Sequence, residues 1–299
     1  MDRYLLVDGL NLAYRCFFAV PELTNAEGVA VNALQGWVRA LWSLEDRLHP
    51  HVTIVFFDQG ISTQRRAILE SYKANRPPMP EALQQQLSSL KKLSQYMGYH
   101  IHFQEGMEAD DLIASAAQHY TSSGHSIFIA SADKDLAQCV SDHVTLLRPS
   151  HQPSAPWKAF DPAAVQQHWG IHPEQMIDYL ALIGDTSDNI PGIPGVGPKT
   201  AQQWLQSFGD IKGIYQHLDR ITPTRFVTSL PSHREQLETN QQLIRLERSL
   251  FMTFEAFPIQ PQDDKMISYL EQLGLDTLAA QARRRYHHER SMGQLSFDL

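Results

Sequence analysis

The sequence predicts an α/β protein with a mostly parallel central sheet flanked by helices, followed by a helical region on the C-terminal side. Three observations support this fold class. Short apolar segments alternate with helical patterns in the first half of the chain. Acidic residues follow each apolar segment. The later part of the chain has helical patterns joined by a loop rich in glycine and proline.

Four short apolar segments have the length and composition of buried strands. They are residues 4–7, 52–57, 99–103 and 126–130. Helical patterns lie between them, at residues 29–48, 80–97 and 109–120. In the last of these, the predicted buried face consists of Leu112, Ile113, Ala116 and Ala117. Strands that alternate with helices form parallel sheets, and ligands bind such sheets at the carboxyl ends of the strands.

Acidic side chains are concentrated at these carboxyl ends. Asp8 and Asp58 directly follow the first two strands. The third and fourth strands are followed by Glu108, Asp110, Asp111, Asp133 and Asp135. A single aspartate after a strand is usually a helix cap or a turn residue. Carboxylates crowded at one edge repel one another, so a group of this size requires cations. Oxygen ligands select hard ions, and we expect Mg²⁺ or Mn²⁺.

The stretch "GDTSDNIPGIPGVGPKT" (184–200) combines two aspartates with a glycine-rich turn. Helices are predicted on both sides, at residues 172–184 and 198–209. Glycines let the backbone approach a ligand, and the free N–H groups that begin the second helix attract phosphates. Lys199 lies in that first turn, where the helix dipole disfavours a cation unless an anion binds nearby. We therefore predict a grip on a phosphodiester backbone, with a rigid turn between two helices as the alternative. Asp185 and Asp188 would complete the acidic cluster.

The formal net charge of −8 would normally oppose nucleic-acid binding. Residues 61–100, however, carry six basic and two acidic side chains, a local net charge of +4. No apolar run is long enough to span a membrane, and the N-terminus lacks the pattern of a signal peptide. The two cysteines, Cys16 and Cys139, argue against a disulfide framework and favour a reducing cytoplasm.

The sequence resembles the bacterial 5′ nuclease family, which includes the 5′–3′ exonuclease part of DNA polymerase I and stand-alone flap endonucleases. The matching stretches occur in the order of the family and cover residues 4 to about 250. They are "LLVDGLNLAYRCFFAV", "FDQGISTQRRAILESYKANRPPMP", "GMEADDLIASAA", "ASADKDLAQCV" and "LIGDTSDNIPGIPGVGPKTA".

The resemblance implies a two-metal site with nine carboxylates, all present here. Those expected mainly at the first metal are Asp8, Asp58, Glu108 and Asp110, with Asp111 nearby. Those expected mainly at the second are Asp133, Asp135, Asp185 and Asp188. Without these nine charges the rest of the chain would carry +1, so the acidity resides largely in the site. Hydrolysis with two Mg²⁺ ions would leave a 5′-phosphate and a 3′-hydroxyl.

Further roles follow from the same resemblance. Lys73 and Arg76 match basic residues that contact the scissile phosphate from a helical arch at about 61–97. Tyr72 would either stack on a base or pack in the core, and Arg15 would touch the strand that enters the site. The backbone grip would use Gly192, Gly195, Gly197 and Lys199, with K⁺ as a further candidate ion at that loop. We expect the arch to be mobile and to become ordered on a 5′ end.

The predicted organisation has three parts. Residues 1–168 form the α/β nuclease region, residues 169–286 a helical DNA-binding region with a helix-hairpin-helix at 173–209, and residues 287–299 a flexible tail. We expect a cytoplasmic monomer that acts on DNA with a 5′ flap or 5′ end. Two other classes stay open at this stage: a structure-specific DNA-binding protein without catalysis, and a metal-dependent ribonuclease of a related fold. The chain could be a stand-alone enzyme or part of a larger polymerase.

The last six residues, "QLSFDL", present apolar side chains at alternating positions of a predicted extended tail. The segment resembles short peptides with which bacterial replication and repair proteins bind the DNA sliding clamp. The residues that would bind are Gln294, Leu295, Phe297 and Leu299. The alternative is that the tail folds back onto its own domain. A clamp-binding function would make residue 299 a natural end of the chain.

Overall fold

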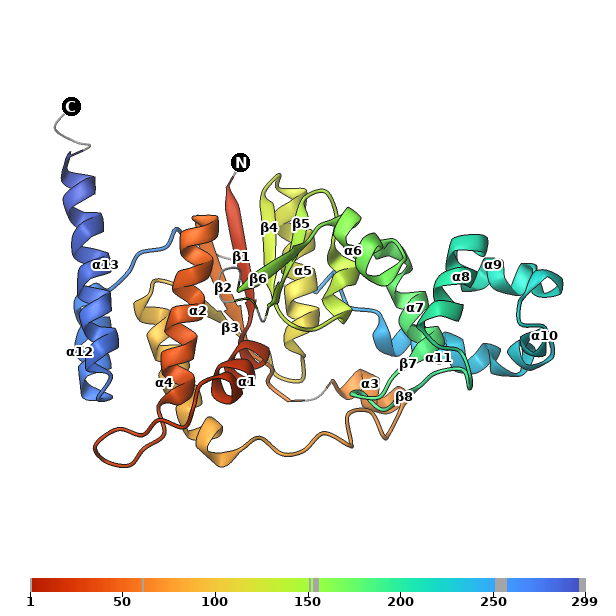
Figure 1. Ribbon diagram of the computed structural model, residues 1–299, viewed down its shortest axis with the longest axis horizontal. Coiled ribbons are helices and arrows are strands. Elements are labelled where there is room, and N and C mark those ends of the chain that lie inside the picture. Colours follow the sequence, from red (N-terminus) through yellow and green to blue (C-terminus); the bar gives the residue numbers. More distant parts are fainter. Residues whose placement is uncertain (1, 61, 151, 153–155, 251–256, 296–299) are drawn as a thin grey trace. The chain divides into compact units, whose positions relative to one another are not determined.

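A computed structural model describes residues 2–60, 62–150, 152, 156–250 and 257–295, with side chains up to residue 286 (Figure 1). The chain has an α/β fold with a mostly parallel sheet flanked by helices, as predicted. It divides into two compact units, each built from distant parts of the sequence. The first unit contains Met1–Phe57, Met79–His102 and Thr253–Leu299, and the second contains Asp58–Pro78 and Phe103–Met252.

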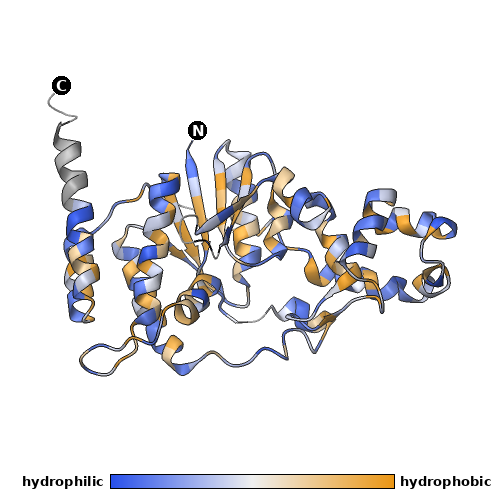
Figure 2. Cartoon of the chain, viewed as in Figure 1, coloured by the Kyte–Doolittle hydropathy of each residue, from blue (hydrophilic) through white to orange (hydrophobic). Residues whose placement is uncertain are grey.

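The first unit has three parallel strands in the order β3-β2-β1. They are β1 (Arg3–Asp8), β2 (Val52–Phe56) and β3 (His100–His102). The helices of this unit are α1 (Gly9–Ala19), α2 (Asn32–Leu48), α4 (Glu81–Tyr96), α12 (Asp263–Gln272) and α13 (Asp276–Leu295). Figure 2 shows that β1 and β2 are mainly apolar, and every residue of β2 is buried.

The N-terminus of α2 receives its cap from another helix. Its own N-cap residue, Val31, has no side chain that could accept a hydrogen bond. The buried amide of Gln86 on α4 accepts instead from the backbone N–H of Ala33 (3.0 Å) and donates to Asn32 (3.2 Å). A helix end buried without such partners would leave polar groups unpaired, so Gln86 fixes the packing of α4 on α2.

The second unit has the strands β4 (Ser126–Ala130) and β5 (Val144–Pro149), which are parallel, and β6 (Trp157–Phe160), which is antiparallel to β5. Before β4 come α3 (Thr63–Ile68) and α5 (Ala109–Ser122). The inward face of α5 is the one predicted: Leu112, Ile113, Ala116 and Ala117 are all buried. The short helix η1 (Asp135–Cys139) follows β4.

The helical region follows β6. Its elements are α6 (Pro162–Trp169), η2 (Pro173–Gln175), α7 (Met176–Ile183), α8 (Pro198–Phe208), α9 (Ile211–Gln216), η3 (Leu218–Arg220), α10 (Arg225–Ser229), η4 (Leu230–His233) and α11 (Arg234–Ile244). A two-stranded antiparallel pair, β7 (Gly184–Asp185) and β8 (Ile190–Pro191), joins α7 to the loop before α8. None of the described helices is long and apolar enough to cross a membrane.

Two predicted segments differ in the structure. The sequence has a helical pattern over residues 232–249, but α11 ends at Ile244, because the backbone beyond it bonds to the side chains of Gln138 and Asp111 instead of continuing the helix. The tail expected to be free from residue 287 continues α13 as far as Leu295. Gln294 and Leu295 therefore have a helical backbone, whereas Phe297 and Leu299 lie outside the described residues.

Candidate metal centre and nucleic-acid interface

The first carboxylate cluster lies at the N-terminal end of α5. One oxygen each from Glu108, Asp110 and Asp111 can be chosen so that all three lie within 4.8 Å of one another. Burial and the charge of Asp111 raise the pKa of Asp110 well above its usual value. Asp58 is anchored beside this cluster, because its Oδ1 accepts from the backbone N–H of Ala109 (2.8 Å). Burial also raises the pKa of Asp58.

The second cluster joins η1 to the β7–β8 pair. Oxygens of Asp135, Asp185 and Asp188 also lie within 4.8 Å of one another. Asp133 supports this cluster, because its Oδ1 accepts from the backbone N–H of Asp135 (2.9 Å). Burial and the charge of Asp133 raise the pKa of Asp135 well above its usual value.

The donor set fits hard divalent cations. The ligand candidates in both clusters are carboxylate oxygens, which Mg²⁺ and Mn²⁺ prefer. Oδ1 of Asp135 is buried and has no hydrogen-bond partner among the described residues. A buried polar atom of this kind is costly unless an ion or water satisfies it. The crowding of three carboxylates in each cluster favours a bound positive charge.

Tyr72 connects the two clusters. Its hydroxyl lies 3.1 Å from Oε2 of Glu108 and 3.2 Å from Oδ2 of Asp188. The side chain is 2% exposed, and burial raises its pKa, as do the charges of Glu108 and Asp188. Of the two roles expected for Tyr72, this conformation has the packed one, because a buried ring offers no face for a base to stack on.

Basic side chains surround the carboxylates. The Lys73 ammonium lies 2.8 Å from Glu108 and 3.9 Å from Asp188. Arg76 contacts Asp188 at 2.5 Å. Burial by itself would raise the pKa of Glu108, but the charges of Lys73 and Arg65 hold it below its usual value. The predicted pair Lys73 and Arg76 therefore lies directly at the acidic residues.

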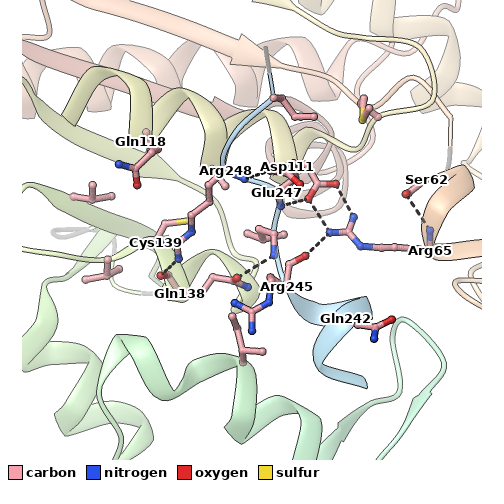
Figure 3. A pocket seen from close by; sticks show the side chains of 18 of the residues that line it. Ser62, Arg65, Asp111, Gln118, Gln138, Cys139, Gln242, Arg245, Glu247 and Arg248 are labelled. Atoms are coloured by element: carbon pink, nitrogen blue, oxygen red, sulfur yellow. Dashed lines mark hydrogen bonds and ion pairs between the residues drawn. The ribbon is translucent and has the colours of Figure 1, made fainter. Parts of the chain in front are cut away.

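Lys134 and Arg65 contact the clusters and were missed by the sequence analysis. Lys134 lies 2.6 Å from Asp185; its place between two aspartates in "SADKD" was the available signal. Arg65 lies 2.7 Å from Glu108 and from Asp111. It borders a cavity of about 840 Å³ that runs along α5 and is also lined by Arg245 (Figure 3). Its partners are distant in sequence, and no local pattern indicates them.

The glycine-rich loop has the backbone geometry that its sequence suggested. Gly195 has a φ of 81°, where glycine is favoured. A Cβ on Gly192 would lie 2.2 Å from the carbonyl oxygen of Ile183, so only glycine fits there. Gly197 is the N-cap of α8 and has no side chain with which to cap it, and Lys199 is exposed in the first turn. These features leave the helix N-terminus available to an anion.

Two predicted residues belong to the first unit. Asp8 is buried and caps α1, with its Oδ1 accepting from the N–H of Asn11 (3.1 Å). Arg15 lies two turns further along α1 and is half-buried. The other eight carboxylates of the predicted metal set all lie in the second unit.

Family models match nearly the whole chain. The model of the 5′-3′ exonuclease N-terminal resolvase-like domain matches residues 3–170. The model of the 5′-3′ exonuclease C-terminal SAM fold matches residues 171–265.

Two sequence relatives illustrate the similarity. A 5′-3′ exonuclease of Aquifex aeolicus is 33% identical over 282 residues, which cover 93% of this chain and 94% of the relative. A DNA polymerase I of Thermus thermophilus is 35% identical over 286 residues, which cover 92% of this chain and 32% of the polymerase. The chain thus spans about a third of the length of the polymerases it matches.

Solved structures share the fold at low sequence identity. A flap endonuclease of bacteriophage T5, in a pseudo-enzyme-product complex with DNA and metal ions, has a TM-score of 0.67 and 22% identity, covering 94% of this chain and 98% of that one. The catalytic core of Rad2 in complex with DNA substrate has a TM-score of 0.59 and 16% identity, covering 91% and 88%.

Proposed function

Because the chain belongs to the 5′-3′ exonuclease family, we propose that it is a structure-specific nuclease for DNA flaps and 5′ ends, active in primer and flap removal. The observation that carries this proposal is the arrangement of two carboxylate clusters around one tyrosine hydroxyl, with Lys73 and Arg76 beside them. Carboxylates that hold cations and basic groups that hold a phosphate are the two requirements of metal-assisted phosphodiester hydrolysis.

The residues would divide between two Mg²⁺ ions, for which Mn²⁺ can substitute. The first ion is assigned to Asp8, Asp58, Glu108 and Asp110. The second is assigned to Asp133, Asp135, Asp185 and Asp188. When bound, the pair of ions supplies an activated water and neutralises charge on the scissile phosphate and the departing oxygen.

Lys73 and Arg76 would hold the scissile phosphate through its non-bridging oxygens. Burial by itself would lower the pKa of Lys73, but Asp110, Glu108 and Asp188 keep it above the usual value. The pKa of Arg76 is likewise raised, with burial opposing and Asp188 favouring the charge. Both side chains therefore stay cationic at neutral pH. They offer fixed positive charge where negative charge grows in the transition state.

The loop from Gly192 to Gly197 would hold the DNA backbone at a second point. Its backbone N–H groups at the start of α8 suit a phosphate, and Lys199 adds charge to the same turn. K⁺ bound to carbonyl oxygens of this loop would strengthen the grip. Such contacts read no sequence, in keeping with a nuclease that recognises the structure of its substrate. We propose that the protein acts as a monomer.

The test is cleavage of a labelled 5′-flap duplex. Cleavage in Mg²⁺, its loss with a chelator and its loss in Asp135→Asn are the expected results, with a 5′-phosphate and a 3′-hydroxyl on the products. The same duplex with an RNA flap measures the preference for the sugar. A protein that binds the flap and leaves it uncut in Mg²⁺ and Mn²⁺ would refute the nuclease and favour a binding function.

We also propose that the C-terminal segment binds the bacterial sliding clamp in the cytoplasm, where a flap nuclease would meet a junction left by a polymerase. The proposal rests on Gln294, Leu295, Phe297 and Leu299 in "QLSFDL". The backbone of Gln294 and Leu295 is helical in the free chain, so clamp binding would require an extended conformation of that turn. Calorimetry of a tail peptide against the clamp tests this: the absence of both heat and competition with a clamp-binding peptide would refute it.

A further inference from the structure

Arg65 uses every hydrogen-bond donor it has. Its Nε donates to the carbonyl oxygen of Leu243 (2.9 Å). One terminal nitrogen donates to Glu108 and Asp111, both at 2.7 Å. The other donates to Asp111 (2.7 Å) and to the carbonyl oxygen of Arg245 (3.2 Å). A guanidinium has five N–H groups, so the hydrogen-bonding capacity of this buried side chain is fully used.

Both carboxylate oxygens of Asp111 also accept hydrogen bonds. Its Oδ2 accepts from Arg65, and its Oδ1 accepts both from Arg65 and from the backbone N–H of Glu247 (2.9 Å) (Figure 3). This is a bidentate pair between a planar fork and a carboxylate, the geometry in which arginine binds most specifically. Asp135 in the second cluster differs, because its Oδ1 has no partner among the described residues. The oxygens of Asp111 are thus already engaged by protein donors, whereas Oδ1 of Asp135 is available to an ion.

We propose that Asp111 is a positioning residue and not a metal ligand, and that the Arg65–Asp111 pair holds Glu108 and Asp110 in place for the first metal. This inference rests on the two-metal function proposed above. Oδ1 of Asp110 lies 3.9 Å from the Arg65 guanidinium and accepts from the backbone N–H of Asp111 (2.7 Å), so both members of the pair contact this carboxylate. Arg65 holds Glu108 through the same nitrogen that holds Asp111.

The pair also fastens the segment that follows α11. Leu243 lies in the last turn of α11 and Arg245 is its C-cap, where carbonyl oxygens lack partners within the helix. Arg65, on α3, donates hydrogen bonds to both of these carbonyl oxygens. Oδ1 of Asp111 accepts a hydrogen bond from the backbone N–H of Glu247. Ser115 on α5 completes the attachment by donating to the Glu247 carbonyl oxygen (2.9 Å). One ion pair thus joins α3, α5 and the end of α11.

The experiment compares Asp110→Asn with Asp111→Asn in two measurements. In chelator, Asp111→Asn should lower the melting temperature by about 5–10 °C, because it breaks a buried bidentate ion pair and leaves Glu108 as the nearest charge partner of Arg65. Asp110→Asn should leave it unchanged or raise it, because it relieves the crowding of three carboxylates whose oxygens lie within 4.8 Å of one another. With Mn²⁺ counted by electron paramagnetic resonance, Asp111→Asn should still bind two ions and Asp110→Asn only one.

The affinity for Mn²⁺ distinguishes a residue that positions the metal ligands from one that only stabilises the fold. Residues that orient metal ligands typically alter affinity by about 10- to 100-fold when changed, so Asp111→Asn and Arg65→Lys should weaken Mn²⁺ binding by that factor at temperatures well below melting. Arg65→Lys keeps the charge and serves if the first variant does not fold. The matched control is Tyr215→Phe, which removes a hydrogen bond to the carbonyl oxygen of Leu230 (2.7 Å) between α9 and η4, two elements that carry none of the clustered carboxylates. It should melt lower with unchanged Mn²⁺ affinity.

The outcomes are distinct. Loss of one Mn²⁺ in Asp111→Asn without loss of stability in chelator would make Asp111 a ligand and overturn the inference. Lower melting of Asp111→Asn and Arg65→Lys with wild-type Mn²⁺ affinity would reduce the pair to a purely structural role and also overturn it. Wild-type protein that binds no Mn²⁺ would instead overturn the proposed two-metal function, and the melting temperatures would still test the ion pair.

Discussion

Replacing Lys73 by alanine removes an ammonium group that lies within 4 Å of a carboxylate in each of the two clusters. It lies 2.8 Å from Glu108 and 3.9 Å from Asp188, and the residue is 9% exposed. A preorganised charge of this kind contributes about 2.7–4 kcal/mol to the transition state, so the chemical step should slow about 10²- to 10³-fold. The dissociation constant should change by less than about tenfold, since one phosphate contact among several is lost.

Single-turnover cleavage of a 5′ flap at saturating enzyme measures the chemical step, and fluorescence anisotropy in Ca²⁺ measures binding. The pH dependence gives a second test. Because the pKa of Lys73 is raised, the group stays protonated up to and beyond its usual value of about 10.4. The ratio of the wild-type rate to the Lys73→Ala rate should therefore stay constant from about pH 6 to 9.

Lys199→Ala is the matched control, because Lys199 is exposed at the start of α8. It should weaken DNA binding and reduce by about one the slope of the logarithm of the binding constant against the logarithm of salt concentration. The cleavage rate at saturating enzyme should stay unchanged. The reasoning would be refuted if Lys73→Ala altered only the dissociation constant, which would make Lys73 an ordinary phosphate contact. A rate ratio that fell steadily above pH 7 would refute the assignment of a permanently charged Lys73.

Three further predictions concern other parts of the chain. Asp185→Ala and Asp188→Ala should retain DNA binding and lower cleavage by orders of magnitude; wild-type rates for both in saturating Mg²⁺ would contradict the second-metal assignment. Gly192→Ala should destabilise the protein by about 1–3 kcal/mol in urea unfolding, because its Cβ would meet the carbonyl oxygen of Ile183 at 2.2 Å; an unchanged midpoint would contradict this. Gln294→Ala should abolish clamp binding in calorimetry and leave cleavage of free DNA unchanged, and residual heat would contradict the motif.

The sequence was most informative where periodicity and chain order carry the structure. The strand at 126–130 has the predicted bounds, and the helix at 109–120 is two residues longer than predicted and buries the expected face. Acidic residues after strands could be assigned to one edge because parallel strands end there together. β5 and β6 were missed, since β6 has only four residues, with the burial order buried, exposed, exposed, buried, and no alternation to indicate a strand.

Contacts between distant residues could not be predicted in this way. Arg65 bonds to Asp111, 46 residues away, and to Leu243, 178 residues away. Nothing in "STQRRAILE" distinguishes Arg65 from Arg66, whose side chain is exposed. The burial of Tyr72 has the same origin, because its partners Glu108 and Asp188 are brought to it only by the folded chain.

The antiparallel pair β7–β8 has a consequence for where a strand of DNA would be cut. Gly184 pairs with Pro191 and Asp185 with Ile190, and a Cβ on Gly184 would lie 2.3 Å from the N atom of Gly192. Asp185, which we assign to the second metal, and Gly192, the first glycine of the loop proposed to hold a phosphate, are thus separated by a short, tightly packed piece of backbone. This segment would fix the distance between the phosphate held by the loop and the metal centre. The number of nucleotides between that phosphate and the hydrolysed bond would then be set by the protein and not by the DNA sequence.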